Sequence, residues 1–168
     1  PALVIGSDCP ALTADPFANP CPAGTYSNVT GLHDVSECLE CPPGSYCFWS
    51  GQTEPTDLCS PGFYCLGGSD EPSPVEGCEP DFYMNEGLCN YSAPIATGSV
   101  CPEGHFCERG SARPVPCPPG TYSPSERNDN ETDCLPCPAT LTCPEAGMVR
   151  PGPPCAPGYY CPPGQRVS

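Results

Sequence analysis

The sequence contains no lysine and few of the residues that build large hydrophobic cores. Only 24 of its 168 residues are Leu, Ile, Val or Phe. The chain has five arginines and 20 acidic residues, which give it a net charge of −15. So little apolar content excludes a large globular core. The acid excess argues against binding to nucleic acid or to anionic membranes. We expect it to keep an elongated protein soluble.

Long apolar runs are also missing, so we expect no membrane insertion. The most apolar stretch outside the repeats, residues 1–5, is too short for a signal peptide and lacks a basic flank. Because the chain stops within a spacer at 162–168, we expect it to be a fragment of a longer ectodomain. If the protein assembles with copies of itself, the apolar edge at 1–5 is a candidate for adding a strand to a neighbour.

Cysteine, proline and glycine are abundant instead, with 17, 28 and 18 residues. This composition first suggests disorder, but regularly spaced cysteines indicate a disulfide framework. A disulfide that closes a loop of about 15 residues contributes roughly 3 kcal/mol, so several can replace a core. The cysteines therefore predict an oxidising compartment, either extracellular or at the cell surface.

Three sequons for N-linked glycans agree with that compartment, beginning at Asn28, Asn90 and Asn130. We expect all three to be exposed and at least one to carry a glycan.

A seven-residue motif, Cys-Pro-x-Gly-x-aromatic-Cys, recurs along the chain. Copies begin at Cys41 and Cys101, close variants at Cys59 and Cys155, copies ending in Ser at Cys21 and Cys117, and degenerate copies at Cys78 and Cys137. Proline fixes one backbone angle, glycine supplies the positive φ of a tight turn, and cysteines anchor both ends. We expect the motif aromatics to pack on the neighbouring repeat: Tyr26, Tyr46, Tyr64, Phe106, Tyr122 and Tyr160.

A longer repeat contains the short one, because six cysteines return in order after 96 residues. We predict six-cysteine modules at 21–65 and 117–161, a four-cysteine linker module at 66–116, an N-terminal segment at 1–20 linked to a preceding module, and the start of another spacer at 162–168. The fold class is small and disulfide-rich, with elongated tandem modules, little regular secondary structure and short two-stranded β ribbons.

The partition leaves Cys9 without a partner inside a module. Its alternatives are a cysteine upstream of the fragment, a local pairing with Cys21 that reshuffles the scheme, or an intermolecular bridge. The spacing also leaves open the connectivity of Cys78, Cys89, Cys101 and Cys107.

The cysteine order resembles the ephrin-receptor-like cysteine-rich repeat and the six-cysteine module of tumour necrosis factor receptors. The resemblance is carried by 117–123, Cys-Pro-Pro-Gly-Thr-Tyr-Ser, followed by Cys-Leu-Pro-Cys-Pro at 134–138. One departure is the five-residue gap between the third and fourth cysteines, which is longer than in the receptor family. The family's pairing would imply Cys21–Cys38, Cys41–Cys59, Cys47–Cys65, Cys117–Cys134, Cys137–Cys155 and Cys143–Cys161. Similar repeats occur in animal receptors, matrix proteins, and protist and algal surface proteins, including the mastigoneme fibres of flagella.

Residues capable of catalysis are scarce, and we expect no enzyme and no cofactor. His105 occupies the variable position of the motif, and His33 lies in the loop that follows Cys21. Neither histidine has a nucleophile held in a rigid pocket beside it.

Two patterns raise the possibility of a metal site, and we expect none. The Cys-x-x-Cys pairs at 38–41 and 134–137 match half a zinc site each, but every neighbouring cysteine fits the oxidised repeat. Asp129, Glu131 and Asp133 alternate as calcium ligands can, and a solvated loop is the alternative that we favour.

These patterns predict a structural protein, part of an extracellular stalk, matrix or surface filament that binds protein partners and carries N-linked glycans. The alternative is a receptor or decoy ectodomain with a ligand face. Its best candidate contact is Phe48 with Trp49, which lies outside the motif, although Trp49 could instead cap its own module.

Overall fold

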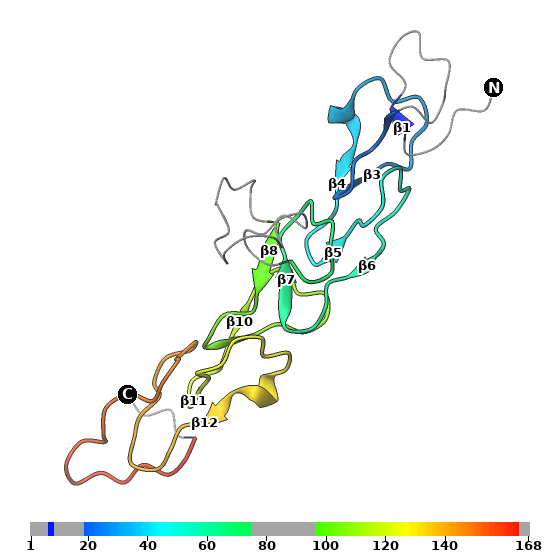
Figure 1. Ribbon diagram of the computed structural model, residues 1–168. Coiled ribbons are helices and arrows are strands. Elements are labelled where there is room, and N and C mark those ends of the chain that lie inside the picture. Colours follow the sequence, from blue (N-terminus) through cyan, green and yellow to red (C-terminus); the bar gives the residue numbers. More distant parts are fainter. Residues whose placement is uncertain (1–6, 9–18, 75–96, 165–168) are drawn as a thin grey trace, which may run out of the picture.

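A computed structural model of the chain describes residues 7–8, 19–74 and 97–164. These residues form a small disulfide-rich fold with seven disulfides, short two-stranded ribbons, two 3-10 turns and no α-helix. The molecule is elongated, with β1 and β2 at one end and the segment coloured red at the other (Figure 1). No helix in the described ranges is long and apolar enough to cross a membrane.

Five of the six ribbons join a motif copy to the residues just before a later copy, and the first ribbon, β1 with β2, precedes the copy at Cys21. The antiparallel pairs are β1 (Ser7–Asp8) with β2 (Asn19–Pro20), β3 (Thr25–Tyr26) with β4 (Leu39–Glu40), β5 (Ser45–Tyr46) with β6 (Asp57–Leu58), β7 (Phe63–Cys65) with β8 (Gly98–Val100), β9 (His105–Phe106) with β10 (Val115–Pro116), and β11 (Thr121–Tyr122) with β12 (Leu135–Pro136). A single bridge between Leu141 and Pro154 continues the series. The 3-10 turns are η1 (Val35–Glu37) and η2 (Glu131–Asp133).

Backbone hydrogen bonds stack the motif copies in a ladder, and we call the contact between successive copies a junction. At the first junction the donor N–H groups and acceptor carbonyls are Gly24 to Cys47, Cys41 to Gly24, Gly51 to Cys21, and Ser27 to Gln52, at 2.8–3.0 Å. Equivalent sets of four follow at the junctions of the copies beginning at residues 41 and 59, 59 and 101, 101 and 117, and 117 and 137. The described residues of the copies at 137 and 155 make three of the four.

The ladder runs through the boundaries of the predicted modules. The copy that begins at Cys101 stacks directly on the copy that begins at Cys59, because Gly62 donates to Cys107 and Cys101 donates back to Gly62. The next junction, across 116, has the same pattern. Among the described residues, the junctions inside the predicted modules and those between them are therefore built alike.

The disulfides follow two rules, and one of them corrects the pairing that the family resemblance implied. Two bridges join the opening cysteine of a Ser-ended copy to a cysteine 17 residues later, as expected: Cys21–Cys38 and Cys117–Cys134. The other five close a copy on itself: Cys41–Cys47, Cys59–Cys65, Cys101–Cys107, Cys137–Cys143 and Cys155–Cys161. The implied pairs Cys41–Cys59, Cys47–Cys65, Cys137–Cys155 and Cys143–Cys161 are therefore wrong.

The physical reason is the tight turn inside each copy, where glycine, or Thr140 in the copy at Cys137, takes the left-handed conformation. It brings the Cα atoms of the opening and closing cysteines to 5.8–6.4 Å, a separation that a disulfide spans. The Ser-ended copies have no closing cysteine, and buried Ser27 and Ser123 stand there instead. Cys101, whose partner the spacing left open, therefore pairs with Cys107. Cys9, Cys78, Cys89 and residues 1–5 lie outside the described residues.

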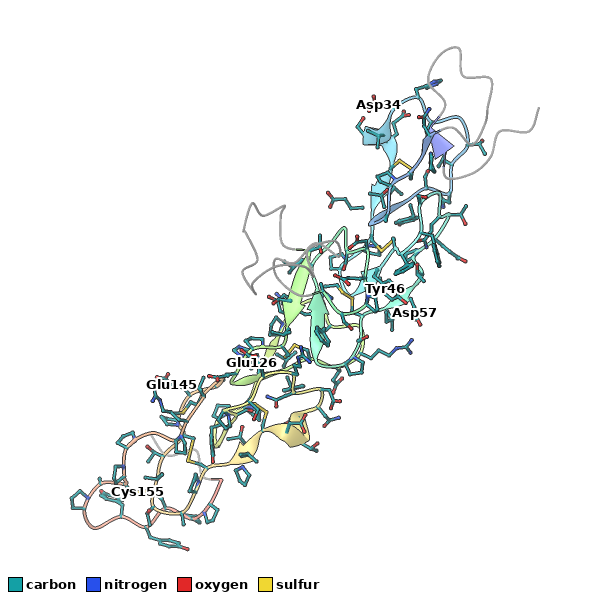
Figure 2. All side chains as sticks on the ribbon, viewed as in Figure 1. Asp34, Tyr46, Asp57, Glu126, Glu145 and Cys155 are labelled. Carbon is teal, nitrogen blue, oxygen red and sulfur yellow. A yellow bond between two sulfur atoms is a disulfide. The ribbon has the colours of Figure 1, made fainter. Side chains whose placement is uncertain are left out.

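A column of disulfides takes the place of a hydrophobic core. Most bridged cysteines are fully buried, and Figure 2 shows the sulfur–sulfur bonds spaced along the molecule. Among the motif aromatics, Phe106 is buried in a cluster with the bridged pair Cys117 and Cys134, and Tyr26, Tyr46, Tyr64 and Tyr122 are half-buried. The prediction fails for Tyr160, which is 82% exposed, because no later copy lies over it among the described residues.

Candidate functional site

Two large aromatic side chains, Phe48 and Trp49, are exposed in the loop that forms part of the first junction. Trp49 is 65% exposed and Phe48 47% exposed, and their rings meet edge to face with centroids 4.6 Å apart. Trp49 therefore does not cap its own module, since most of its surface faces solvent. Exposed paired aromatics of this kind are candidates for binding contacts.

Polar side chains hold this pair in place within the loop between β5 and β6. The N–H of Phe48 donates to Thr56 Oγ1 at 3.0 Å, and the N–H of Trp49 donates to Gln52 Oε1 at 2.6 Å. Gln52 Nε2 in turn donates to Thr56 Oγ1 at 2.8 Å and to the carbonyl of Glu54 at 3.0 Å. The aromatic pair is presented on a braced loop, which lowers the entropy lost when it binds something.

The same loop is fastened to the preceding motif copy. Gly51, with φ +73°, donates its N–H to the carbonyl of Cys21, and the N–H of Ser27 donates to the carbonyl of Gln52 at 3.0 Å. In Figure 1 the chain between β5 and β6 accordingly reaches back along the stack toward β3. These bonds place Gln52, which accepts the N–H of Trp49, beside Ser27.

The first sequon begins at that point. Asn28, Val29 and Thr30 are all exposed, as predicted for a glycosylation site, and they directly follow buried Ser27. The Ser27 hydroxyl accepts the N–H of Val29 at 3.3 Å, which fixes the first turn of the sequon. Sequence reasoning identified Asn28 and the aromatic pair separately, but it missed the junction that fastens their two segments to each other.

The sequon at Asn130 is part of a capped 3-10 turn. Asn130 is the N-cap of η2, and its Oδ1 accepts the N–H of Thr132 at 3.0 Å and the Thr132 hydroxyl at 3.1 Å. The Asp133 carboxylate accepts the N–H of Asn130 at 3.1 Å, completing a capping box. These bonds use Oδ1 and not Nδ2, the atom that carries a glycan, and Asn130 is an exposed residue. The third sequon, at Asn90, lies outside the described residues.

Asp34 occupies the equivalent cap 96 residues earlier. It caps η1, and the backbone N–H of Ser36 bonded to its carboxylate lowers the pKa of Asp34. The backbone N–H groups of His33 and Asp34 likewise lower the pKa of Glu37. An Asp therefore performs the same capping role that Asn130 performs in η2.

The other candidate residues take structural positions. Asp133, considered as a calcium ligand, accepts the N–H groups of Asp129 and Asn130. The described residues contain no group of three or more metal-binding side chains. His33 lies exposed beside the cap of η1, and His105 lies in β9 with its Nδ1 3.0 Å from the carbonyl of Glu103.

No known protein-family model matches the chain. A curated protein with a similar segment is the ABC-type transporter claG of Penicillium crustosum, which is 33% identical over 78 residues. The match covers 41% of this chain and 10% of the transporter. The matched part of this chain therefore spans only about a tenth of the length of that relative.

Proposed function

We propose that the chain is a non-enzymatic structural component of an extracellular stalk, matrix or surface filament, in the manner of mastigoneme proteins. It acts as a stiff spacer made of glycosylated disulfide repeats. The observation that carries the proposal is the ladder of backbone hydrogen bonds, which continues through six junctions of the described residues. Repeats stacked in one dimension set a length rather than enclose a pocket.

The rod is stiff because bending it at a junction would break the backbone hydrogen bonds there. A complete junction holds four backbone hydrogen bonds, each contributing about 0.5–1.5 kcal/mol, so opening one costs roughly 2–6 kcal/mol. The disulfide within each self-closed copy survives bending and keeps the turn of that copy intact. A net charge of −15 further favours an extended over a folded-back chain.

Small-angle scattering and electron microscopy of the oxidised, glycosylated protein test this proposal. We expect a particle of constant rod-like shape that loses its stiffness when a reductant opens the disulfides. We also expect native material to form fibres or end-to-end rods. A flexible or compact oxidised particle contradicts the stiff spacer, and monomers that remain dispersed at all concentrations contradict the filament.

The alternative is a ligand-binding receptor or decoy ectodomain, favoured by the exposed pair Phe48 and Trp49. A pull-down of secreted proteins with the native chain and with Trp49→Ala separates the two functions. Loss of a specific partner in the variant supports the receptor. The similarity to a segment of a transporter agrees with either function, because it places a related stretch inside a larger protein.

A further inference from the structure

We infer that the exposed pair Phe48 and Trp49 is the resting surface of an N-linked glycan on Asn28. The glycan is the chain's own modification, so this inference rests on the extracellular location in the proposed function. It assigns the aromatic pair an occupant that is covalently attached to the same junction.

The first observation is that hydrogen bonds connect the residue before Asn28 to the loop that carries Trp49. Asn28 follows Ser27, whose N–H donates to the carbonyl of Gln52 at 3.0 Å, and the side chain of Gln52 accepts the N–H of Trp49 at 2.6 Å. Hydrogen-bonded backbones of this kind run about 5 Å apart. A sugar attached to Asn28 therefore starts within one residue of the loop that displays the indole.

The second observation is a comparison that the chain makes with itself. The junction recurs 96 residues later, where Gly147 donates to Cys117 and Ser123 donates to Met148. At the equivalent positions there, Asn28 is replaced by Pro124, and the aromatic pair is replaced by Pro144 and Glu145. The sequon and the aromatic pair are thus absent together while the backbone bonds remain, so the two are not needed to build the junction.

The third observation concerns chemistry. The rings lie edge to face and are held by bonds to their backbone N–H groups, so both side chains keep apolar surface open to solvent. N-acetylglucosamine, the first sugar of an N-linked glycan, has an apolar face of ring C–H groups that stacks on such a surface while its hydroxyls stay in water. A neutral sugar also avoids the repulsion that an acidic partner would meet on this chain.

The test uses the fact that Trp49 is the only tryptophan in the sequence. The protein is secreted from eukaryotic cells in native form, as Thr30→Ala, which removes the Asn28 sequon, and as Asn130→Asp, the matched control. Asn130→Asp removes a different sequon and keeps its cap, because Asp34 caps η1 in the same way. Mass spectrometry determines glycan occupancy at Asn28, and acrylamide quenching measures the exposure of the indole.

We expect occupancy at Asn28 and roughly a twofold increase in the quenching constant in Thr30→Ala, because a stacked sugar covers one of the two faces of the indole. The Asn130→Asp control should match the native protein. Enzymatic removal of glycans from the folded native protein should reproduce the Thr30→Ala value, which separates loss of the sugar from an effect of the substitution.

Two results would overturn the inference, and they differ in what else they affect. An occupied Asn28 with equal quenching in native and Thr30→Ala protein rejects the stacking and leaves the structural function intact. An unoccupied Asn28 rejects the stacking and also the glycan coat at this site, while the rod itself is judged by scattering.

Discussion

Replacing Gly44 by alanine should open one junction of the ladder and leave distant junctions closed. Gly44 has φ +83°, a conformation that costs residues with a Cβ, and its two backbone groups bond to the copy that begins at Cys59. Its N–H donates to the carbonyl of Cys65 and its carbonyl accepts the N–H of Cys59. A Cβ at this position would overlap the carbonyl oxygen of Gly110 and lie 3.3 Å from its carbonyl carbon.

The size of the effect follows from these contacts. A left-handed conformation costs an alanine about 1–2 kcal/mol. Displacing Gly44 from its two hydrogen bonds adds about 0.5–1.5 kcal/mol for each, so opening the junction becomes easier by roughly 2–5 kcal/mol. Gly158→Ala is the matched control, because Gly158 has φ +87° and no atom lies within 4 Å of its Cβ position. It should show only the conformational cost.

Amide hydrogen exchange of the oxidised protein, followed residue by residue by NMR, measures the effect. In Gly44→Ala the N–H of Cys59 should lose protection by a factor of about 30 to several thousand. The N–H of Cys137, which makes the equivalent bond to Gly120, should keep its protection. Equal effects of Gly44→Ala and Gly158→Ala, or a uniform loss along the chain, would refute the contact of Gly44 as the cause.

Three further predictions concern other parts of the ladder. Thr140 has φ +73° at the motif's glycine position, so Thr140→Gly should raise the thermal unfolding temperature. The substitution removes about 1–2 kcal/mol of strain, and the greater entropy of glycine in the unfolded chain costs about 0.5–1 kcal/mol. An unchanged or lower unfolding temperature would contradict this prediction. Folding lowers the pKa values of Asp34 and Glu37, so their stabilisation of η1 should be complete above about pH 5 and be lost as the pH falls below about 4. Hydrogen exchange of the capped backbone amides should then become faster. Capped amides that keep their protection at low pH would contradict this prediction. In a variant with Cys9→Ala, Cys78→Ala and Cys89→Ala and a specific protease site inserted after Glu54, cleavage should separate two unlinked halves on a non-reducing gel, because the bridges on either side each close a motif copy on itself; halves that stay together would restore the family's pairing.

The spacing of cysteine, glycine and aromatic residues was enough to predict the disulfide-rich class, the glycine turns and the short ribbons. The bridge pattern was predicted less well, because it was taken from a family instead of from the motif. The sequence held a better signal: each Ser-ended copy is followed by one additional cysteine, Cys38 or Cys134. A copy with its own closing cysteine has a partner six residues away, and a copy that lacks one needs the additional cysteine.

Two residues break the rule that glycine fills the left-handed positions, and sequence alone did not identify them. Thr140 replaces the motif glycine, and Arg127, with φ +62°, replaces the glycine that bonds back to the preceding copy. The guanidinium of Arg127 lies 5.3 Å from the ring centroid of Phe63, a contact that offsets part of the strain. Because 63 and 127 are brought together only by stacking across three copies, no local pattern could reveal this pair.

The ladder also explains how such a chain combines a fixed scaffold with variable surface features. Three parts of the chain make the junction and ribbon bonds. They are the motif itself, the two residues in each spacer that bond back to the preceding copy, such as Gly51 and Gln52, and the strand just before the next copy. In the described parts of the spacers, the remaining residues make none of these bonds, so the length and composition of a spacer are free to change, and the spacers in the sequence do differ in length. Asn28 and Trp49 both lie in such spacers. Differences in function among related chains should therefore be concentrated in the spacers, while the glycine and cysteine positions preserve the rod.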